Sequence, residues 1–167
     1  MPAKNREELF VLLLSHLRQG TERTATILEE LGDAAQNPEV KEALHARAFV
    51  TNKILATLDE AFKQMGQKPV TLPGRLQEVF VEDFRRELAE INSPEARRLF
   101  VLAKAHQLIN LRTGEYLVLI AAADASGHHG VGVLLESCLA DTQSFIERNR
   151  RLIRNILEAK VAAAKSA

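Results

Sequence analysis

The sequence predicts an all-α fold, a bundle of four long helices, and three observations support this prediction. The chain has 167 residues, of which 46% are hydrophobic, with Leu and Ala dominant, and only 5% are aromatic. Leu and Ala favour helices, whereas β-branched and aromatic residues favour strands. Four long stretches carry apolar residues at alternating spacings of three and four, which is typical of a helix with one buried stripe. Two of these stretches begin with a capping residue followed by Pro-Glu, a frequent start of a helix.

The first two long helices are predicted over Asn5 to Asp33 and from Asn37 to about Met65. Gly32 ends the first helix, and the short link makes the two helices antiparallel neighbours. Gly20, inside the first helix, either weakens it or lets a neighbouring group approach closely. The two stripes are Phe10, Leu14, Leu17, Thr21, Thr24, Leu28 and Leu31, then Leu44, Ala48, Thr51, Leu55, Leu58, Phe62 and Met65.

A long crossover follows the second helix. Residues 67–73 contain two prolines and form a linker, and Leu76 to Ile91 form a shorter amphipathic helix. A simple up-and-down bundle needs no such connection. A long crossover between the second and third long helices is the ferritin-like arrangement, in which these two helices run roughly parallel.

The third long helix contains Leu99 to Ala123, and the fourth runs from about Val131 to Ala159. Their stripes are Leu99, Leu102, His106, Ile109, Thr113, Tyr116, Ile120 and Ala123, then Val131, Leu135, Cys138, Thr142, Phe145, Asn149, Leu152 and Ile156. The length suits a single domain over residues 1–167, and residues 160–167 are expected to form a frayed tail.

Charge and composition exclude several classes of function. The 22 Lys and Arg residues balance the 22 Asp and Glu residues, and zero net charge makes nucleic-acid binding an unfavoured function. Cys138 is the single cysteine, which excludes an intramolecular disulfide and fits a reducing compartment. The start of the chain lacks the apolar core of a secretory signal, and the apolar run Leu9 to Leu14 is too short to span a bilayer. We therefore expect a cytoplasmic protein with no membrane segment.

Four segments relate the chain to a known family. They are REELFVLLLSHLRQGTERTATILEEL, NPEVKEAL, LDEAFKQMGQKP and GVGVLLESCLADTQSFIERNRRL, within about residues 6 to 157. These segments resemble the YciE/YciF-like ferritin-like stress proteins of bacteria. The resemblance implies a four-helix ferritin-like bundle that is usually dimeric, with a di-metal carboxylate site between its helices.

The ligand positions that the resemblance implies hold few carboxylates in this chain. In helix order they fall on Thr21 with Glu22 beside it, on Phe49 or Val50, on Ile109 and Arg112, and near Asp141 and Thr142. A di-metal centre needs about four to six converging oxygen and imidazole ligands. A shift of one residue rotates a helical side chain by about 100°. We therefore predict that the fold is kept without metal, cofactor or catalytic residues.

A comparison of the residues that lie at the same height along the four helices also predicts that no metal is bound. It places neutral residues in the central layer: Thr21, Thr24, Ala48, Thr51, Thr113 and Thr142. A threonine hydroxyl in a helix can donate to the carbonyl four residues back. Threonine is therefore a neutral filler at positions where carboxylates would repel one another.

The alternative interpretation is a divergent di-metal protein with iron or manganese, active in iron oxidation or peroxide handling. Its candidate ligands are Glu22, His45, Glu115 and Asp141. The pattern Glu42-x-x-His45 has the spacing of two ligands on one helix face, but so short a pattern often arises by chance.

Other reactive side chains have structural interpretations. His106 is expected in the core or an interface, and Cys138 as an inert buried thiol. Tyr116 is expected to have a packed ring with its hydroxyl in water. His128 and His129 are expected in a loop, where adjacent side chains point in different directions.

Apolar residues outside the stripes predict self-association. The columns Leu139, Ile146, Ile153 and Val101, Leu108, Val118 exceed what one four-helix core buries, which indicates a homodimer through apolar helix faces. Arg148, Arg151 and Arg154 form a ridge that we interpret as an exposed helix face, with a contact to an anion, a nucleic acid or another macromolecule as the alternative. The expected function is that of a non-enzymatic, stress-associated protein that acts through helix packing and self-association.

Overall fold

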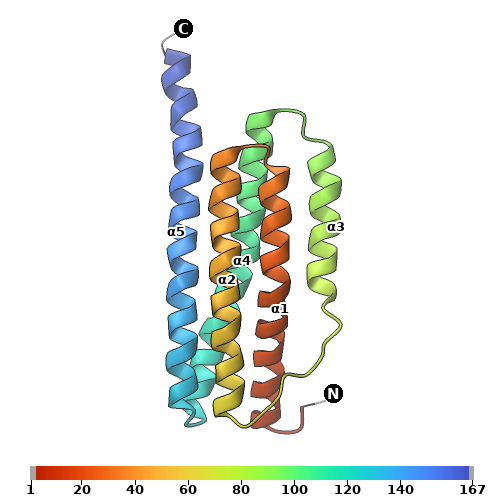
Figure 1. Ribbon diagram of the computed structural model, residues 1–167, viewed down its shortest axis with the longest axis vertical. Helices are drawn as coiled ribbons and strands as arrows, with labels where there is room; N and C mark the ends of the chain where they lie inside the picture. Colours follow the sequence, from red (N-terminus) through yellow and green to blue (C-terminus); the bar gives the residue numbers. More distant parts are fainter. Residues whose placement is uncertain (1–2, 166–167) are drawn as a thin grey trace.

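The computed structural model describes residues 3–165, with side chains described to residue 158, and contains five α-helices in that range. Helices α1 (Arg6–Ala34) and α2 (Pro38–Gln64) form one antiparallel hairpin, and α4 (Pro94–Ala125) and α5 (His129–Lys165) form another (Figure 1). The short helix α3 (Arg75–Ala89) lies in the crossover between the hairpins.

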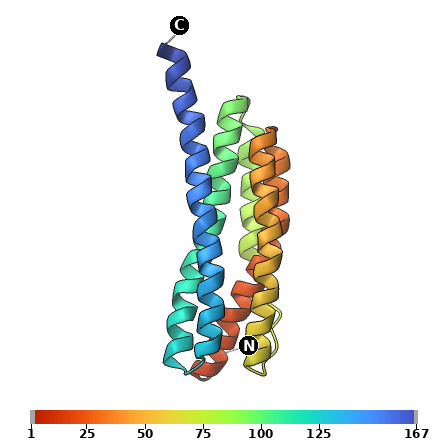
Figure 2. The same ribbon diagram turned by 60° about the vertical axis from the view of Figure 1, so that its left-hand side comes forward.

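The four long helices form a ring in the order α1, α2, α5, α4. Each packs closely against its two neighbours in this ring, whereas α2 and α4 lie on a diagonal with little contact. The crossover carries the chain back along the bundle, so α2 and α4 run in the same direction (Figures 1 and 2). The predicted ferritin-like bundle, with a long helical crossover between its second and third long helices, is confirmed.

The helix ends follow the signals read from the sequence. Three capping side chains accept a hydrogen bond from a backbone N–H three residues on: Asn5 from Glu8 (2.8 Å), Asn37 from Val40 (3.0 Å) and Ser93 from Ala96 (3.3 Å). Gly66 and Gly127 follow α2 and α4 with φ of 64° and 78°, a left-handed conformation that glycine adopts without strain. The predicted boundaries of α3 and the predicted start of α5 differ from the observed ones by one or two residues.

The predicted stripes of α1, α2 and α5 face the core. All stripe residues of α1 are buried, and in α2 and α5 only Leu55, Met65, Leu152 and Ile156 are half-buried. In α4 the buried face is wider than the predicted stripe. Ala105, Arg112 and Leu119 are buried, whereas His106, Thr113 and Ile120 are half-buried. The reason is that α4 packs against α1, α5 and α3, so it buries a broad face.

The apolar core consists of two clusters at opposite ends of the bundle. One contains Phe10, Leu14, Leu58, Tyr116 and Leu135, and the other contains Leu28, Leu44, Phe84, Leu102 and Ile109. Each cluster includes residues from all four long helices, and α3 adds Phe84 to the second. Buried threonines and arginines lie between the two clusters.

The crossover is fastened to α1 by side-chain hydrogen bonds. Gln19 donates to the backbone oxygen of Leu72 (2.7 Å) and accepts from its nitrogen (3.1 Å). Ser15 accepts from the nitrogen of Val70 (3.0 Å), and Arg23 donates to the oxygen of Gly74 (2.6 Å). The extended part of the crossover therefore has a defined path along α1.

The predicted interface columns are partly wrong. Val101, Leu108 and Leu139 are buried within the chain itself. Val101 and Leu108 belong to the apolar cluster that contains Phe84, because α3 covers α4 at this level. Val118 is exposed, and Ile146 and Ile153 are half-buried.

The end of the chain continues α5. The backbone is helical to Lys165, over most of the predicted tail, and residues 166–167 lie outside the described residues. This helix extends beyond the ends of the other three long helices (Figures 1 and 2). No helix in the described range is long and apolar enough to cross a membrane.

Candidate functional site

A layer of polar side chains crosses the bundle between the two apolar clusters. Its members come from all four long helices and are buried: Thr21, Thr24, Arg47, Thr51, Arg112 and Thr142. This is the level at which a ferritin-like bundle carries inward-pointing metal ligands. The layer is therefore the first place to look for chemistry.

The four buried threonines hydrogen-bond within their own helices. Each hydroxyl donates to the carbonyl four residues back: Thr21 to Leu17 (2.7 Å), Thr24 to Gly20 (2.7 Å), Thr51 to Arg47 (2.9 Å) and Thr142 to Cys138 (2.8 Å). This arrangement was predicted from the sequence and is confirmed. Thr113 makes a longer bond of the same kind (3.3 Å) and is only half-buried.

Arg47 brings a buried cation into the layer from α2. The residue is 5% exposed, and its guanidinium donates to the hydroxyl of Thr142 (3.2 Å) and the backbone oxygen of Asp141 (3.4 Å). The guanidinium carbon lies 5.4 Å from the centre of the Phe145 ring, within cation–π range. Burial lowers the pKa of Arg47 because removal from water disfavours the charged form.

Arg112 brings a second cation from α4. It is 3% exposed, and its Nη1 lies 2.8 Å from Oε2 of Glu115, although the approach does not have hydrogen-bond geometry. Burial lowers the pKa of Arg112 and raises that of Glu115, and the attraction between the two opposes both shifts. The pair is thus a largely buried ion pair.

Gly20 makes room for Arg112. A Cβ at position 20 would lie 1.7 Å from Nη1 of Arg112. Of the two sequence interpretations of this mid-helix glycine, close approach by a neighbouring group is the one that the structure supports. The approaching group is a side chain of α4.

Tyr116 and Cys138 lie beside the layer and are both buried. Burial raises the pKa of the phenol above its ordinary value, and burial raises the pKa of the thiol from 9.0 to about 11. The expectation that the thiol is buried is confirmed. The expected water-exposed hydroxyl of Tyr116 is wrong, because the whole residue is only 1% exposed.

The candidate metal ligands lie apart from one another. Glu22 is exposed, 3.6 Å from Arg18, and His45 lies 3.5 Å from Asp33. Glu115 faces Arg112, and Asp141 offers its backbone oxygen to Arg47. Among the described residues no three His, Cys, Asp or Glu side chains are grouped as a metal site would require. The residues present therefore do not fit a di-metal centre.

The ligand positions that the resemblance implies are buried on α1 and α4, whereas on α2 one of the two candidates is exposed and the other, Val50, is half-buried. The buried positions on α1 and α4 are Thr21, Ile109 and Arg112. On α2, however, Phe49 is 77% exposed, and the layer is formed by Arg47 and Thr51. Arg47 was missed, although it lies three residues after Leu44 and four before Thr51, a spacing that places it on the buried face.

The remaining histidines serve as local contacts. His128 lies 3.2 Å from Glu7 and stacks on Phe10, which joins the α4–α5 turn to the start of α1. His129 lies 3.8 Å from Asp124. His106 is half-buried on α4, and its Nδ1 has no hydrogen-bond partner in the described part of the chain.

Comparison with known proteins identifies a family and a fold. Residues 5–162 match the family model described as Domain of unknown function (DUF892). The crystal structure of the E. coli stress protein YciF matches with a TM-score of 0.87 and 20% identity, over 93% of this chain and 99% of that one. YcfI from Rhodopseudomonas palustris matches with a TM-score of 0.83 and 20% identity, over 88% of this chain and 94% of that one. No curated protein sequence matches the chain.

Gly20→Ala tests the packing of Arg112 against α1. In the wild-type protein the new methyl group would displace the buried guanidinium, and we expect the free energy of unfolding to fall by about 1–3 kcal/mol. In an Arg112→Ala background the space beside position 20 is empty. There Gly20→Ala should raise the free energy of unfolding by up to about 1 kcal/mol, because alanine favours the helix more than glycine does. Denaturant unfolding of the four proteins measures both effects. Equal effects in the two backgrounds would contradict the proposed contact.

Alkylation of Cys138 tests the burial of the thiol. Because the pKa rises from 9.0 to about 11, the thiolate fraction at pH 8 is about a hundredfold lower than that of a free cysteine. We expect iodoacetamide to react with the native protein at least about 100-fold more slowly than with the urea-unfolded protein. Mass spectrometry over time gives both rates, and comparable rates would show that the thiol is accessible.

Proposed function

The chain belongs to the family described as Domain of unknown function (DUF892), and we propose that it is a metal-free, self-associating ferritin-like protein of the bacterial cytoplasm. In this proposal it acts in a stress response through packing and binding and carries out no catalysis. The likeness in fold to a protein described as a stress protein supports the association with stress. The buried cations of the central layer support the absence of metal.

The single observation that carries the proposal is the pair Arg47 and Arg112 in the layer where metal ligands would lie. A divalent ion about 6 Å from one guanidinium would be repelled by about 5 kcal/mol at an effective dielectric constant of about 20. The nearby threonine hydroxyls already donate to their own helices, and the carboxylate of Glu115 is held by Arg112. This layer attracts anions and repels metal ions.

Self-association is best supported by the outer face of α4. Its exposed residues over four turns include no charged side chain: Gln107, Asn110, Leu111, Gly114, Leu117, Val118 and Ala121. Leu117 and Val118 are 56% and 58% exposed, and a Cβ at Gly114 would meet nothing within 4 Å. An uncharged face with large apolar side chains and small residues suits the close approach of a second copy.

Metal content tests the absence of a di-metal centre. We expect protein purified from cells grown with added iron and manganese to contain well below one equivalent of either metal per chain. Addition of Fe²⁺ or Mn²⁺ without oxygen should leave the melting temperature unchanged. An ion raises the melting temperature only if it binds the folded protein more tightly than the unfolded protein, and the proposal gives the folded protein no metal site. A ferritin-like di-iron protein prepared in parallel is the control for metal loading. Two equivalents per chain, lost in Glu115→Gln, would support the alternative di-metal function and overturn this one.

Val118→Glu tests the α4 outer face. The wild-type protein should be a dimer in light scattering at micromolar concentration. Val118→Glu should shift it to monomer, because the charge would be buried without a partner. Phe49→Glu is the matched control, since Phe49 is an exposed apolar residue on α2, diagonal to α4. A monomeric wild-type protein, or equal effects of the two variants, would refute this interface.

A further inference from the structure

The groove between α2 and α5 has the features of a ligand site. It encloses about 330 Å³ and lies alongside the polar layer, on the side where Arg47 enters the core. Most of its wall is apolar, with Leu44 and Val50 from α2, Leu102 from α4 and Leu152 from α5. The volume is at the lower end of the range for small-molecule pockets.

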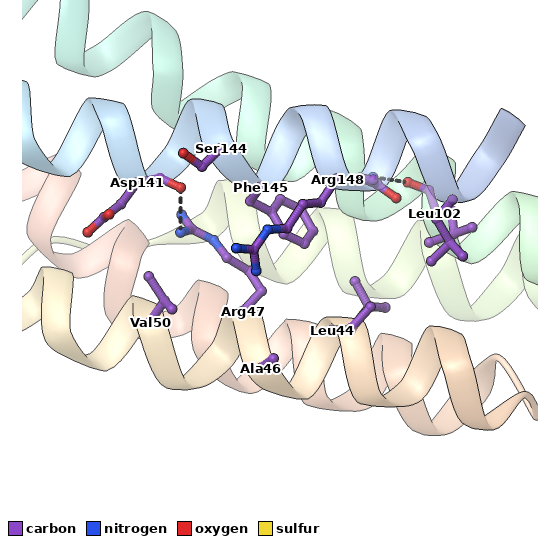
Figure 3. Close-up of a pocket in the computed structure, with 12 residues that line it drawn as sticks. Leu44, Ala46, Arg47, Val50, Leu102, Asp141, Ser144, Phe145 and Arg148 are labelled. Atoms are coloured by element: carbon purple, nitrogen blue, oxygen red, sulfur yellow. Dashed lines mark hydrogen bonds between the residues drawn. The ribbon is translucent and has the colours of Figure 1, made fainter. Parts of the chain in front are cut away.

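Two guanidinium groups enter this groove from opposite helices. Figure 3 shows Arg47 rising from α2 and Arg148 descending from α5, with the ring of Phe145 overlapping the Arg148 side chain in this view. Neither arginine lies within 4.0 Å of a carboxylate in the part of the chain whose side chains are described. Asp141 contributes its backbone oxygen, and its carboxylate points away from the two guanidinium groups (Figure 3). The carboxylate therefore attracts Arg47 only from beyond ion-pair distance, which partly opposes the fall in the pKa of Arg47. The groove thus has an excess of positive charge.

Hydrogen-bonding groups in the groove are also incompletely satisfied. The Nε of Arg47 is buried and has no partner within the described chain, although both Nη atoms have one. Asn149, also buried, donates to the backbone oxygen of Leu102 (3.0 Å), but its Oδ1 has no partner there. Buried polar atoms are rarely left unpaired, and a buried cation without a counter-ion is unfavourable. The unpaired Nε–H donor of Arg47 and the two guanidinium groups without an ion pair among the described side chains point to an anion that is bound in this groove, whereas the unpaired Oδ1 of Asn149, an acceptor, calls for a donor.

We propose that the groove between α2 and α5 binds a small organic carboxylate with an apolar body. The planar carboxylate accepts from the unpaired Nε of Arg47 and from the neighbouring guanidinium of Arg148. The apolar body packs against the leucines and valine of the groove wall and against Phe145. This site is separate from the α4 outer face, and its existence does not depend on whether the protein self-associates.

Binding of octanoate and benzoate, measured by calorimetry with the full chain, tests the proposal. We expect at least one of them to bind with a dissociation constant below about 1 mM, the value of a weak small-ligand site. Octanol and benzamide, which lack the charge, should bind at least about tenfold more weakly. Inorganic phosphate, which lacks the apolar body, should also bind at least about tenfold more weakly. Two outcomes would overturn the proposal. One is that neither carboxylate binds at about 10 mM, tenfold above that dissociation constant. The other is that phosphate binds as tightly as the carboxylates.

Matched variants locate the site. Arg148→Met should weaken carboxylate binding at least about tenfold, whereas Arg151→Met, on the same helix but outside the groove, should leave it unchanged. Arg47→Met could disturb the core, so the second pair of variants does not change Arg47. One variant of this pair fills the groove without altering its charge, and the other is its control. Ala46 and Ala56 are both exposed on α2, and only Ala46 lines the groove. Ala46→Trp should abolish binding and Ala56→Trp should not. Equal effects within either pair would place binding elsewhere and refute the assignment.

Discussion

Positive charge buried in the middle of the bundle is the constraint on which the central structure depends. A guanidinium removed from water requires a nearby anion or several acceptors, and it requires space. Arg112 obtains the anion from Glu115, one turn along α4, and the space from Gly20 on α1. Arg47 obtains acceptors from α5 and the face of Phe145, and one of its donors remains without a partner among the described residues. Gly20, which by itself would weaken α1, is therefore required because the side chain of Arg112 on α4 occupies the space beside it.

The threonines explain how the bundle accommodates this layer. Each buried hydroxyl bonds to its own helix and places no demand on a neighbouring helix. The two apolar clusters, one toward each end, each join all four long helices. The crossover adds a further constraint, because its hydrogen bonds to Ser15, Gln19 and Arg23 fix its path along α1. A ferritin-like arrangement can thus persist while the chemistry of its centre changes.

The two proposed surfaces lie on different parts of the bundle. The α4 outer face belongs to the helix diagonal to α2, whereas the carboxylate groove lies between α2 and α5. A second copy and a small ligand would therefore not compete directly. Arg148, Arg151 and Arg154 are all exposed, as expected from the sequence, and only Arg148 also lines the groove. The groove would therefore use one residue of the arginine ridge, in an anion contact of the kind that was the alternative interpretation.

The sequence alone determined the helices, their caps, the buried stripes of α1, α2 and α5, and the ferritin-like crossover. These features follow from local spacing and from connection length, which a single chain displays directly. It also identified the threonine bonds, because those bonds stay within one helix. Only the tertiary structure decided which residues of α4 are buried, since α4 packs against α1, α5 and α3 and so buries a broader face than the heptad pattern predicts. It likewise decided that Gly20 faces Arg112 and that Arg47 and Arg148 share one groove. Each of these facts joins helices that are distant in sequence, and long charged side chains can turn either toward the core or toward water, so periodicity within one helix could not reveal them.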